Sequence, residues 1–251
     1  MTKREPLQSE AYFDEFISFK NAVINRDQQA LLNDPTQFAR PDALASFVFN
    51  HQRALFIAEY SRGYPVENMH AAFIKIIESF GQLKDLDPEN TFALTFKTDM
   101  DDYVRALWLV SQAALLDIAP DMLHRMLCCI GNEGQDLLFE QLVAALVPGV
   151  SRKPAKKLLY PKAYQPLYDA VMAPAEQQDA FVHFFLQNWY KQMRNTAWHG
   201  NHKLVDGGFF GYWCWEAAGV AVAFGIDDAR FRNLPYYPKD LADFARSRVS
   251  G

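Results

Sequence analysis

The string Asp99-Met100-Asp101-Asp102 places three carboxylates within four residues and could carry acid chemistry. Because neighbouring like charges raise the pKa of one member, a carboxyl in such a string can stay protonated and start a carbocation cascade. A helix start explains the same residues, since Thr98 and Asp101 have the spacing of a capping box before an apolar helical pattern. Acidic residues in a first helical turn also interact favourably with the positive end of the macrodipole. We therefore interpret the string as the start of a helix.

His199 and His202 lie three residues apart with Asp206 close by, and imidazoles at this spacing can share a metal ion. A helical metal-dependent hydrolase that uses these three residues is one alternative function. The sequence has no HExxH motif, and two loop histidines are more often turn residues that face solvent. We expect no metal, no cofactor and no catalytic residue, so the sequence indicates a protein that is not an enzyme.

Motifs that bind phosphate or activate a nucleophile are missing from the sequence. It contains no GxGxxG, no GxxxxGK[ST] and no GxSxG string. The 251 residues carry a formal net charge of -5, with a sequence pI near 5.7. Non-specific nucleic-acid binding needs a dominant basic field. We therefore expect no nucleic-acid partner.

Apolar residues recur at steps of three and four along most of the chain, which is the pattern of amphipathic helices. Met69, Phe73, Ile76 and Phe80 form one such face. Proline and glycine signals predict a helix that spans residues 41–63. The whole pattern predicts an all-α fold, a helical bundle of about nine or ten helices in two packed lobes.

The charge composition changes after residue 148. Residues 1–150 hold 21 acidic and 12 basic residues, whereas residues 151–251 hold 9 acidic and 13 basic residues. The segment SRKPAKKLLYPK at 151–162 carries five basic residues and two prolines, which is typical of an exposed linker. We expect an acidic N-terminal helical lobe over residues 1–150 and a C-terminal helical lobe over residues 151–251.

The three cysteines are Cys128, Cys129 and Cys214. An odd number with two adjacent members does not predict a disulfide framework, and the spacing is not that of a zinc site. We expect buried free thiols in a reducing compartment. No apolar segment follows the first basic residues, and the longest apolar stretch, residues 217–226, is far too short to span a membrane. The expected location is the cytoplasm, without membrane contact.

A resemblance to a known family rests on three strings near the C-terminal end. They are GYWCWEAA at 211–218, GIDD at 225–228 and LPYYPKDL at 234–241. In order and spacing they resemble the C-terminal signature of the PoNe immunity proteins (PoNi). The resemblance implies a non-catalytic inhibitor of a cognate PoNe DNase toxin, which is delivered between bacteria, for example by type VI secretion. Within the signature we expect Asp227 and Asp228 to cap a turn, and residues 236–238 to hold the last helix on the core.

Charge gives a physical reason for such an inhibitor to bind a nuclease. A DNase presents a cationic cleft to DNA phosphates, so an inhibitor can compete for the cleft by presenting carboxylates. Residues 85–136 hold ten acidic and three basic residues, the most acidic part of the chain. We expect the toxin-binding residues there: Asp85, Asp87, Glu89, Asp99, Asp101, Asp102 and Asp121.

The predicted function is an immunity protein that occludes the DNA-binding or active site of its toxin with an acidic surface. A helical adaptor for another protein partner is the second alternative, because it would share the acidic face. The predicted partner is a protein toxin, and a homo-oligomer stays open.

Overall fold

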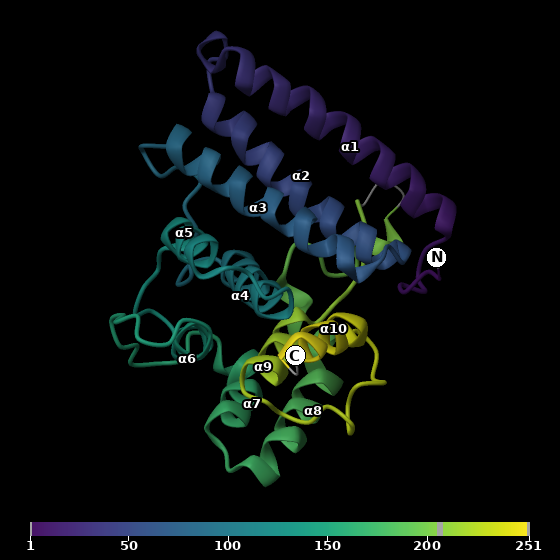
Figure 1. Cartoon of the computed structure of the whole chain (residues 1–251), viewed down its shortest axis with the longest axis vertical. Coiled ribbons are helices and arrows are strands. Elements are labelled where there is room, and N and C mark those ends of the chain that lie inside the picture. The colour runs from purple at the N-terminus through teal and green to yellow at the C-terminus, as the bar shows by residue number, and fades with distance from the viewer. Residues whose placement is uncertain (1, 205–207, 250–251) are drawn as a thin grey trace. The chain divides into compact units, whose positions relative to one another are not determined.

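The computed structural model describes residues 2–204 and 208–249. These residues form ten α-helices and three short 3-10 helices without any strand, so the prediction of an all-α fold is confirmed (Figure 1). The α-helices are α1 (Glu10–Asn33), α2 (Pro41–Arg62), α3 (Val66–Leu86), α4 (Met100–Leu115), α5 (Pro120–Ile130), α6 (Leu137–Leu146), α7 (Pro161–Met172), α8 (Ala175–Gln192), α9 (Trp215–Ala223) and α10 (Lys239–Val249). The 3-10 helices are η1 (Pro35–Gln37), η2 (Met193–Asn195) and η3 (Asn201–Lys203).

The helices form two compact units, and each unit is assembled from separate stretches of chain. The first unit comprises the described residues of 1–93, 121–130 and 201–212, and the second those of 94–120, 131–200 and 213–251.

Residue 150, near which the charge composition changes, lies inside the second unit. The basic segment 151–162 is also held within that unit. The Arg152 guanidinium lies 2.6 Å from the Glu140 carboxylate, and the Leu159 N–H donates to Asp136 Oδ2 over 2.8 Å.

In the first unit, α1 and α3 both pack against α2, and the three helices lie side by side (Figure 1). Stacked rings of Phe49 and Phe80, with centroids 4.3 Å apart, join α2 to α3. The predicted helix from Pro41 ends at Gly63, which adopts a left-handed φ of 100°. A side chain there would place its Cβ 2.1 Å from the carbonyl oxygen of Thr2, so only glycine fits this helix end.

Residues 208–212 also belong to the first unit, although they are distant in sequence from α1 to α3. The Tyr212 N–H donates to Glu5 Oε2 over 3.0 Å, and Ser61 Oγ donates to the Phe210 carbonyl over 2.7 Å. These hydrogen bonds satisfy buried polar groups, which would be costly to leave unpaired. They fasten the late segment to the N-terminal helices.

The second unit is built around α9, which contacts α4, α6, α7, α8 and α10. The sequence pattern predicts a buried helix of small residues here, and residues 215–221 are all buried. Gly219 allows α4 to approach closely, because a Cβ at this position would lie 2.4 Å from Cβ of Ser111. The close packing of α9 against α4 therefore requires glycine at position 219.

Two further sequence expectations have mixed outcomes. Cys129 and Cys214 are buried free thiols as predicted, but the prediction for Cys128 is wrong, because α5 turns this residue toward solvent beside His124. None of the described helices is both long enough and apolar enough to cross a bilayer.

Candidate functional site

The seven acidic residues expected to bind a partner are divided between the two units. Asp85, Asp87, Glu89 and Asp121 lie in the first unit, whereas residues 99, 101 and 102 lie in the second.

Two of the acidic residues display their charge where α3 ends. Asp85 lies in the last turn of α3 and Glu89 in the turn that follows, and both side chains are exposed. Neither carboxylate has a hydrogen-bond or ion-pair partner among the described residues. Lys84, also exposed, bonds to the side-chain oxygen of Asn90 and adds a positive charge to the same turn.

Asp87 does not display its charge, although it lies between Asp85 and Glu89 in sequence. Its side chain is only 4 % exposed. Its two carboxylate oxygens accept hydrogen bonds of 2.8 Å from the backbone N–H groups of Thr91 and Phe92. Asp87 therefore closes the turn after α3 and does not contribute a free surface carboxylate.

Asp121 is exposed in the first turn of α5. A carboxylate at this place interacts favourably with the positive end of the helix macrodipole, by roughly 0.3–1 kcal/mol. In the part of the chain that the structure describes, the Asp121 carboxylate forms no hydrogen bond and no ion pair with another side chain. It can present negative charge to a binding partner.

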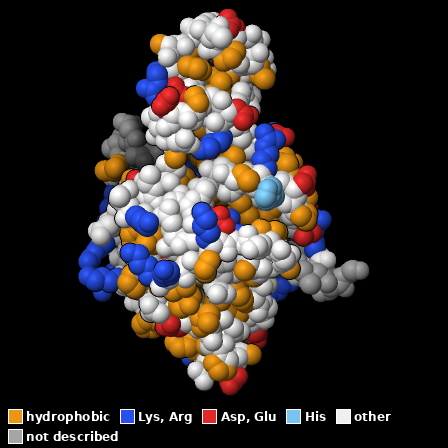
Figure 2. Space-filling model, turned by 90° about the vertical axis from the view of Figure 1, so that its left-hand side faces the viewer, with side chains coloured by type: hydrophobic (Ala, Val, Ile, Leu, Met, Phe, Trp, Pro, Cys, Tyr) orange, Lys and Arg blue, Asp and Glu red, His pale blue; other side chains and the backbone are white. Residues whose placement is uncertain are grey.

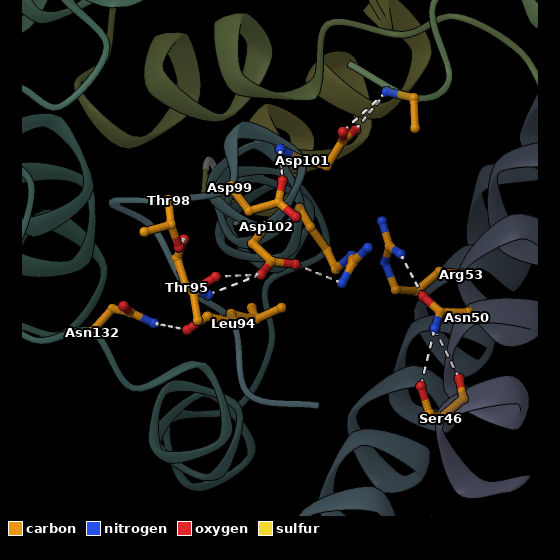
Figure 3. A network of polar contacts seen from close by, with 12 residues as sticks. Ser46, Asn50, Arg53, Leu94, Thr95, Thr98, Asp99, Asp101, Asp102 and Asn132 are labelled. Atoms are coloured by element: carbon orange, nitrogen blue, oxygen red, sulfur yellow. Dashed lines mark hydrogen bonds and ion pairs between the residues drawn. The ribbon is translucent and has the colours of Figure 1, made fainter. Parts of the chain in front are cut away.

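The three aspartates at the start of α4 point to three different local partners (Figure 3). Asp99 caps the helix by accepting a hydrogen bond of 2.8 Å from the Asp101 N–H. Asp101 accepts from the Ala197 N–H at 3.1 and 3.0 Å, and burial raises the pKa of its carboxyl. The Asp102 carboxylate accepts from Thr95 N–H at 2.9 Å and pairs with the Arg105 guanidinium at 3.0 Å.

The expected capping box at Thr98 is wrong by one residue. Asp99 is the N-cap, with an extended backbone at φ -131° and ψ 116°. Both residue types are good N-caps. The observed choice follows from the backbone, because the Thr98 N–H bonds back to the Thr95 carbonyl in a turn that precedes the helix.

Other acidic residues of segment 85–136 also have structural roles. Asp136 is completely buried and caps α6, where its carboxylate accepts hydrogen bonds from the Tyr103 hydroxyl and the N–H groups of Phe139 and Leu159. Burial raises the pKa of its carboxyl, while these hydrogen bonds lower it. The net charge of the segment therefore overstates the charge that reaches the surface.

The view in Figure 2 shows how charges are distributed on one face. On this face, the Asp and Glu side chains drawn in colour lie singly or next to Lys and Arg side chains and do not form one continuous patch. The exposed carboxylates can act through local charge on each unit: Asp85, Glu89, Asp99 and Asp121.

The histidines of the alternative metal site have other local partners. The His199 ring stacks on Tyr190 with centroids 4.3 Å apart. Nδ1 of His202 lies 2.8 Å from the Tyr212 hydroxyl, within hydrogen-bond distance. Asp206 lies outside the described residues, and among the described ones no group of three His, Cys, Asp or Glu side chains could hold a metal ion. The geometry gives no support to a metal-dependent hydrolase.

The C-terminal signature residues hold the second unit together. Asp227 Oδ1 accepts from the Ala229 N–H over 3.0 Å and caps a turn, as expected. Asp228 is buried, with Arg246 of α10 at 2.5 Å and the Tyr237 hydroxyl at 3.0 Å from its Oδ2. Asp228 was expected to cap a turn as well, but its carboxylate bonds to the side chains of Arg232, Tyr237 and Arg246 instead. Through Tyr237, residues 236–238 help to hold α10 on the core, as expected.

Comparisons with known proteins cover nearly the whole chain. Residues 4–128 match a family model described as PoNe immunity protein (PoNi), N-terminal. Residues 134–241 match the model described as PoNe immunity proteins (PoNi), C-terminal. A search of curated proteins found no match.

One solved structure supports the fold. The crystal structure of protein PA2201 from Pseudomonas aeruginosa is similar, with a TM-score of 0.72 and 19% sequence identity. The similarity covers 99% of this chain and 93% of that chain, and at this identity it shows the fold alone.

Proposed function

The chain belongs to the PoNe immunity protein (PoNi) family, and from this membership we propose how it acts as an immunity protein against a PoNe toxin. It binds the toxin directly and occludes the DNA-binding or active site with exposed carboxylates. The observation that carries the proposal is the match of both family models, which together span residues 4–128 and 134–241. The binding takes place in the cytoplasm, where an incoming nuclease meets its DNA substrate.

The charge of the expected target supports this mechanism. A DNase binds phosphates through Lys and Arg side chains, so its substrate site carries positive potential. Carboxylates on an inhibitor are attracted to the same site, and this attraction speeds association more than it adds to final affinity. Occlusion then requires no chemical step, which fits a protein that is not an enzyme.

The local structure indicates how the seven expected residues divide their tasks. We assign direct charge display to Asp85, Glu89 and Asp121 in the first unit and to Asp99 in the second. Asp87, Asp101 and Asp102 accept backbone hydrogen bonds that hold neighbouring segments in place. They contribute to binding by shaping the backbone on which the exposed carboxylates lie.

Co-expression with the PoNe toxin encoded beside this chain tests the function. Cells that produce both proteins are expected to survive with intact DNA, and the purified proteins are expected to form a complex. Association is expected to slow as salt is added, because screening weakens attraction between exposed charges. Loss of DNA integrity despite full expression of this chain would contradict the immunity function. Binding to other proteins but not to the toxin would also contradict it and would favour the adaptor.

A complex that forms with no salt dependence would instead contradict occlusion by charge. A nuclease assay on the purified complex tests directly whether the DNA site of the toxin is covered. Occlusion predicts that inhibition and complex formation follow the same concentration dependence, since a covered DNA site cannot bind substrate.

A further inference from the structure

The first unit contains a polar groove, and none of the residues that line it belongs to the acidic segment 85–136. The groove has a volume of about 230 Å³ and lies over α2, between the side chains of α1 and those of α3. Roughly 300–1,000 Å³ is usual for sites that bind drug-sized ligands. The groove is therefore too small for a large ligand and has the scale of a single side chain.

Each of the three helices contributes one face to this groove. The lining residues recur at steps of three and four, the spacing of residues on one side of a helix. They are Asn21, Ile24, Asn25 and Gln28 of α1, Gln52, Leu55, Phe56 and Glu59 of α2, and Ala72, Lys75 and Glu78 of α3. Amide and carboxylate oxygens are thus brought together from three helices.

Gln52 offers the groove an amide that is not used elsewhere in the described chain. Its side chain is only 5 % exposed and lines the groove. No described residue forms a hydrogen bond with its amide. The amide atoms are not among the fully enclosed polar atoms that lack a partner, so they open into the groove. An amide that opens into a narrow groove forms its hydrogen bonds with water or with a polar group that enters the groove. The Gln52 amide is therefore available to a group that enters the groove.

Glu59 adds a carboxylate about two turns beyond Gln52 on the same face of α2. Its carboxyl is half-buried and burial raises its pKa to about 7, which the charge of Lys75 only partly offsets. No ion pair is formed by Glu59 within the described parts of the chain. A desolvated carboxylate without a close counter-ion is stabilised by any cation that can reach it.

The charge of the whole groove favours a cation over an anion. Two carboxylates, Glu59 and Glu78, face one ammonium group, Lys75. The side-chain amides of Asn25, Gln28 and Gln52 offer carbonyl oxygens that accept hydrogen bonds. A guanidinium group presents five N–H donors in a planar fork and accepts none, so it matches a site rich in oxygen acceptors.

We propose that this groove receives one arginine side chain of a partner protein, with Glu59 as its counter-ion and Gln52 as a hydrogen-bond acceptor. The identity of that partner as the PoNe toxin rests on the proposed function, whereas the chemistry of the groove does not. The apolar stem of the arginine packs against Leu55 and Phe56, which line the same groove.

A small cation tests the groove without any toxin. The whole chain is titrated with L-argininamide, while NMR follows the carboxyl of Glu59 and the side-chain amide of Gln52. Both signals are expected to shift with saturation, and Glu59→Gln is expected to abolish the saturable shift. L-citrullinamide is the matched control, because it has nearly the same shape but a neutral urea in place of the guanidinium. Shifts that are absent, or equal for the two compounds, would overturn the proposal.

Binding to the toxin encoded beside this chain is the second arm. Glu59→Gln is expected to weaken the complex about tenfold, the effect of losing one charge-assisted hydrogen bond. Glu67→Gln, an exposed acid in the first turn of α3 outside the groove, is expected to leave the affinity unchanged. Equal affinity of the parent and Glu59→Gln would overturn the groove as a contact with toxin while leaving the immunity function intact. Failure of the parent itself to bind would instead contradict the proposed function, and the argininamide titration would still decide the groove.

Discussion

Trp189 donates a hydrogen bond of 2.7 Å from its indole Nε1–H to Oε1 of Glu216, a side chain that is completely buried. The Tyr164 hydroxyl donates to the same oxygen over 3.1 Å, while Oε2 has no hydrogen-bond partner among the described residues. Burial raises the pKa of Glu216 to about 7, although the hydrogen bonds from Trp189 and Tyr164 act in the opposite direction. A carboxyl in the centre of the second unit therefore titrates near neutrality.

The stability of the protein is expected to fall as pH rises from about 4.5 to about 7, because only the unfolded chain readily releases the Glu216 proton in that window. The contribution of the protonated Glu216 carboxyl to stability is complete below pH 4.5, the ordinary pKa of glutamate, and is lost once the pH exceeds about 7, the pKa in the folded protein. It amounts to about 3 kcal/mol. Tyr103, Tyr164 and Cys214, which lie close by, stay neutral in this window because burial raises each pKa well above its usual value. Urea denaturation at pH 5 and pH 8 measures the effect.

Glu216→Gln is the matched variant for this measurement. It keeps an oxygen that accepts from Trp189 and Tyr164 but cannot ionise, so it should reduce the pH dependence relative to the parent. The part that Glu59 contributes remains in both proteins, because burial raises the pKa of Glu59 to about 7 as well. Equal slopes for the two proteins would show that the Glu216 carboxyl does not titrate as described.

Gly219→Ala is expected to destabilise the protein by roughly 1–3 kcal/mol, the usual cost of overpacking a core. The added Cβ would lie 2.4 Å from Cβ of Ser111, which cannot move without shifting α4. Gly81→Ala is the control, because the three atoms nearest its Cβ all belong to the guanidinium of exposed Arg125, from 2.6 Å, and this flexible side chain can move away. Thermal unfolding should show a lower Tm for Gly219→Ala alone. Equal losses at both positions would refute the close packing of α4 and α9.

Charge reversal at Asp85 and Glu89 is expected to slow association with the toxin about tenfold at low salt, with little change in Tm. Both side chains are exposed, and neither carboxylate has a hydrogen-bond or ion-pair partner among the described residues. Charge reversal therefore removes the attraction to the toxin without removing a contact that stabilises the fold. Stopped-flow association at several salt concentrations measures this effect. An association rate equal to that of the parent at low salt would remove these two residues from the proposed surface.

Charge reversal at Asp99, Asp101 and Asp102 should behave differently. These carboxylates accept hydrogen bonds from Asp101 N–H, Ala197 N–H and Thr95 N–H. Losing a cap and two further hydrogen bonds is expected to cost about 2 kcal/mol or more. Circular dichroism during heating should show the loss before any binding assay is interpreted. An unchanged Tm would mean that these contacts do not stabilise the start of α4.

Asp228→Asn is expected to destabilise the second unit by about 3 kcal/mol, since it leaves the guanidinium groups of Arg232 and Arg246 without their shared buried counter-ion. Burial alone would raise the pKa of Asp228, but Arg246 and Tyr237 hold it below its usual value. This contribution is therefore present above about pH 4 and is lost in acid.

Asp243→Asn provides the comparison, because Asp243 binds Arg232 at 2.7 Å with a side chain that is 52% exposed. Exposed ion pairs contribute about 1 kcal/mol or less. Chemical denaturation of both variants should separate them clearly, and similar midpoints would contradict a buried role for Asp228.

The positions of helices could be predicted from local sequence signals. The individual residues that cap them could be predicted only in part. The helix from Pro41 to Gly63 was predictable because proline favours a first turn and glycine a left-handed end. At α4 the signals were ambiguous, since Thr98 and Asp99 are both suitable caps and only the folded turn selects Asp99.

The candidate sites were less predictable because side-chain burial depends on tertiary contacts. Nothing in the string from Asp85 to Glu89 indicates that the middle acid, Asp87, closes a turn while its neighbours face solvent. Gln52 illustrates the same point, because glutamine is usually exposed, and three helices must pack before this residue becomes buried beside the groove. Spacing on each helix was visible in the sequence, but the groove exists only when the helices are assembled.

The hydrogen bonds of Glu5 with Tyr212 and of Ser61 with Phe210 join the beginning of the chain to a segment made much later. A ribosome synthesises these partners in order, so the N-terminal helices emerge long before residues 208–212 exist. During translation their polar groups must be satisfied by water or by chaperones. The first unit is therefore complete only after residues 208–212 have been synthesised.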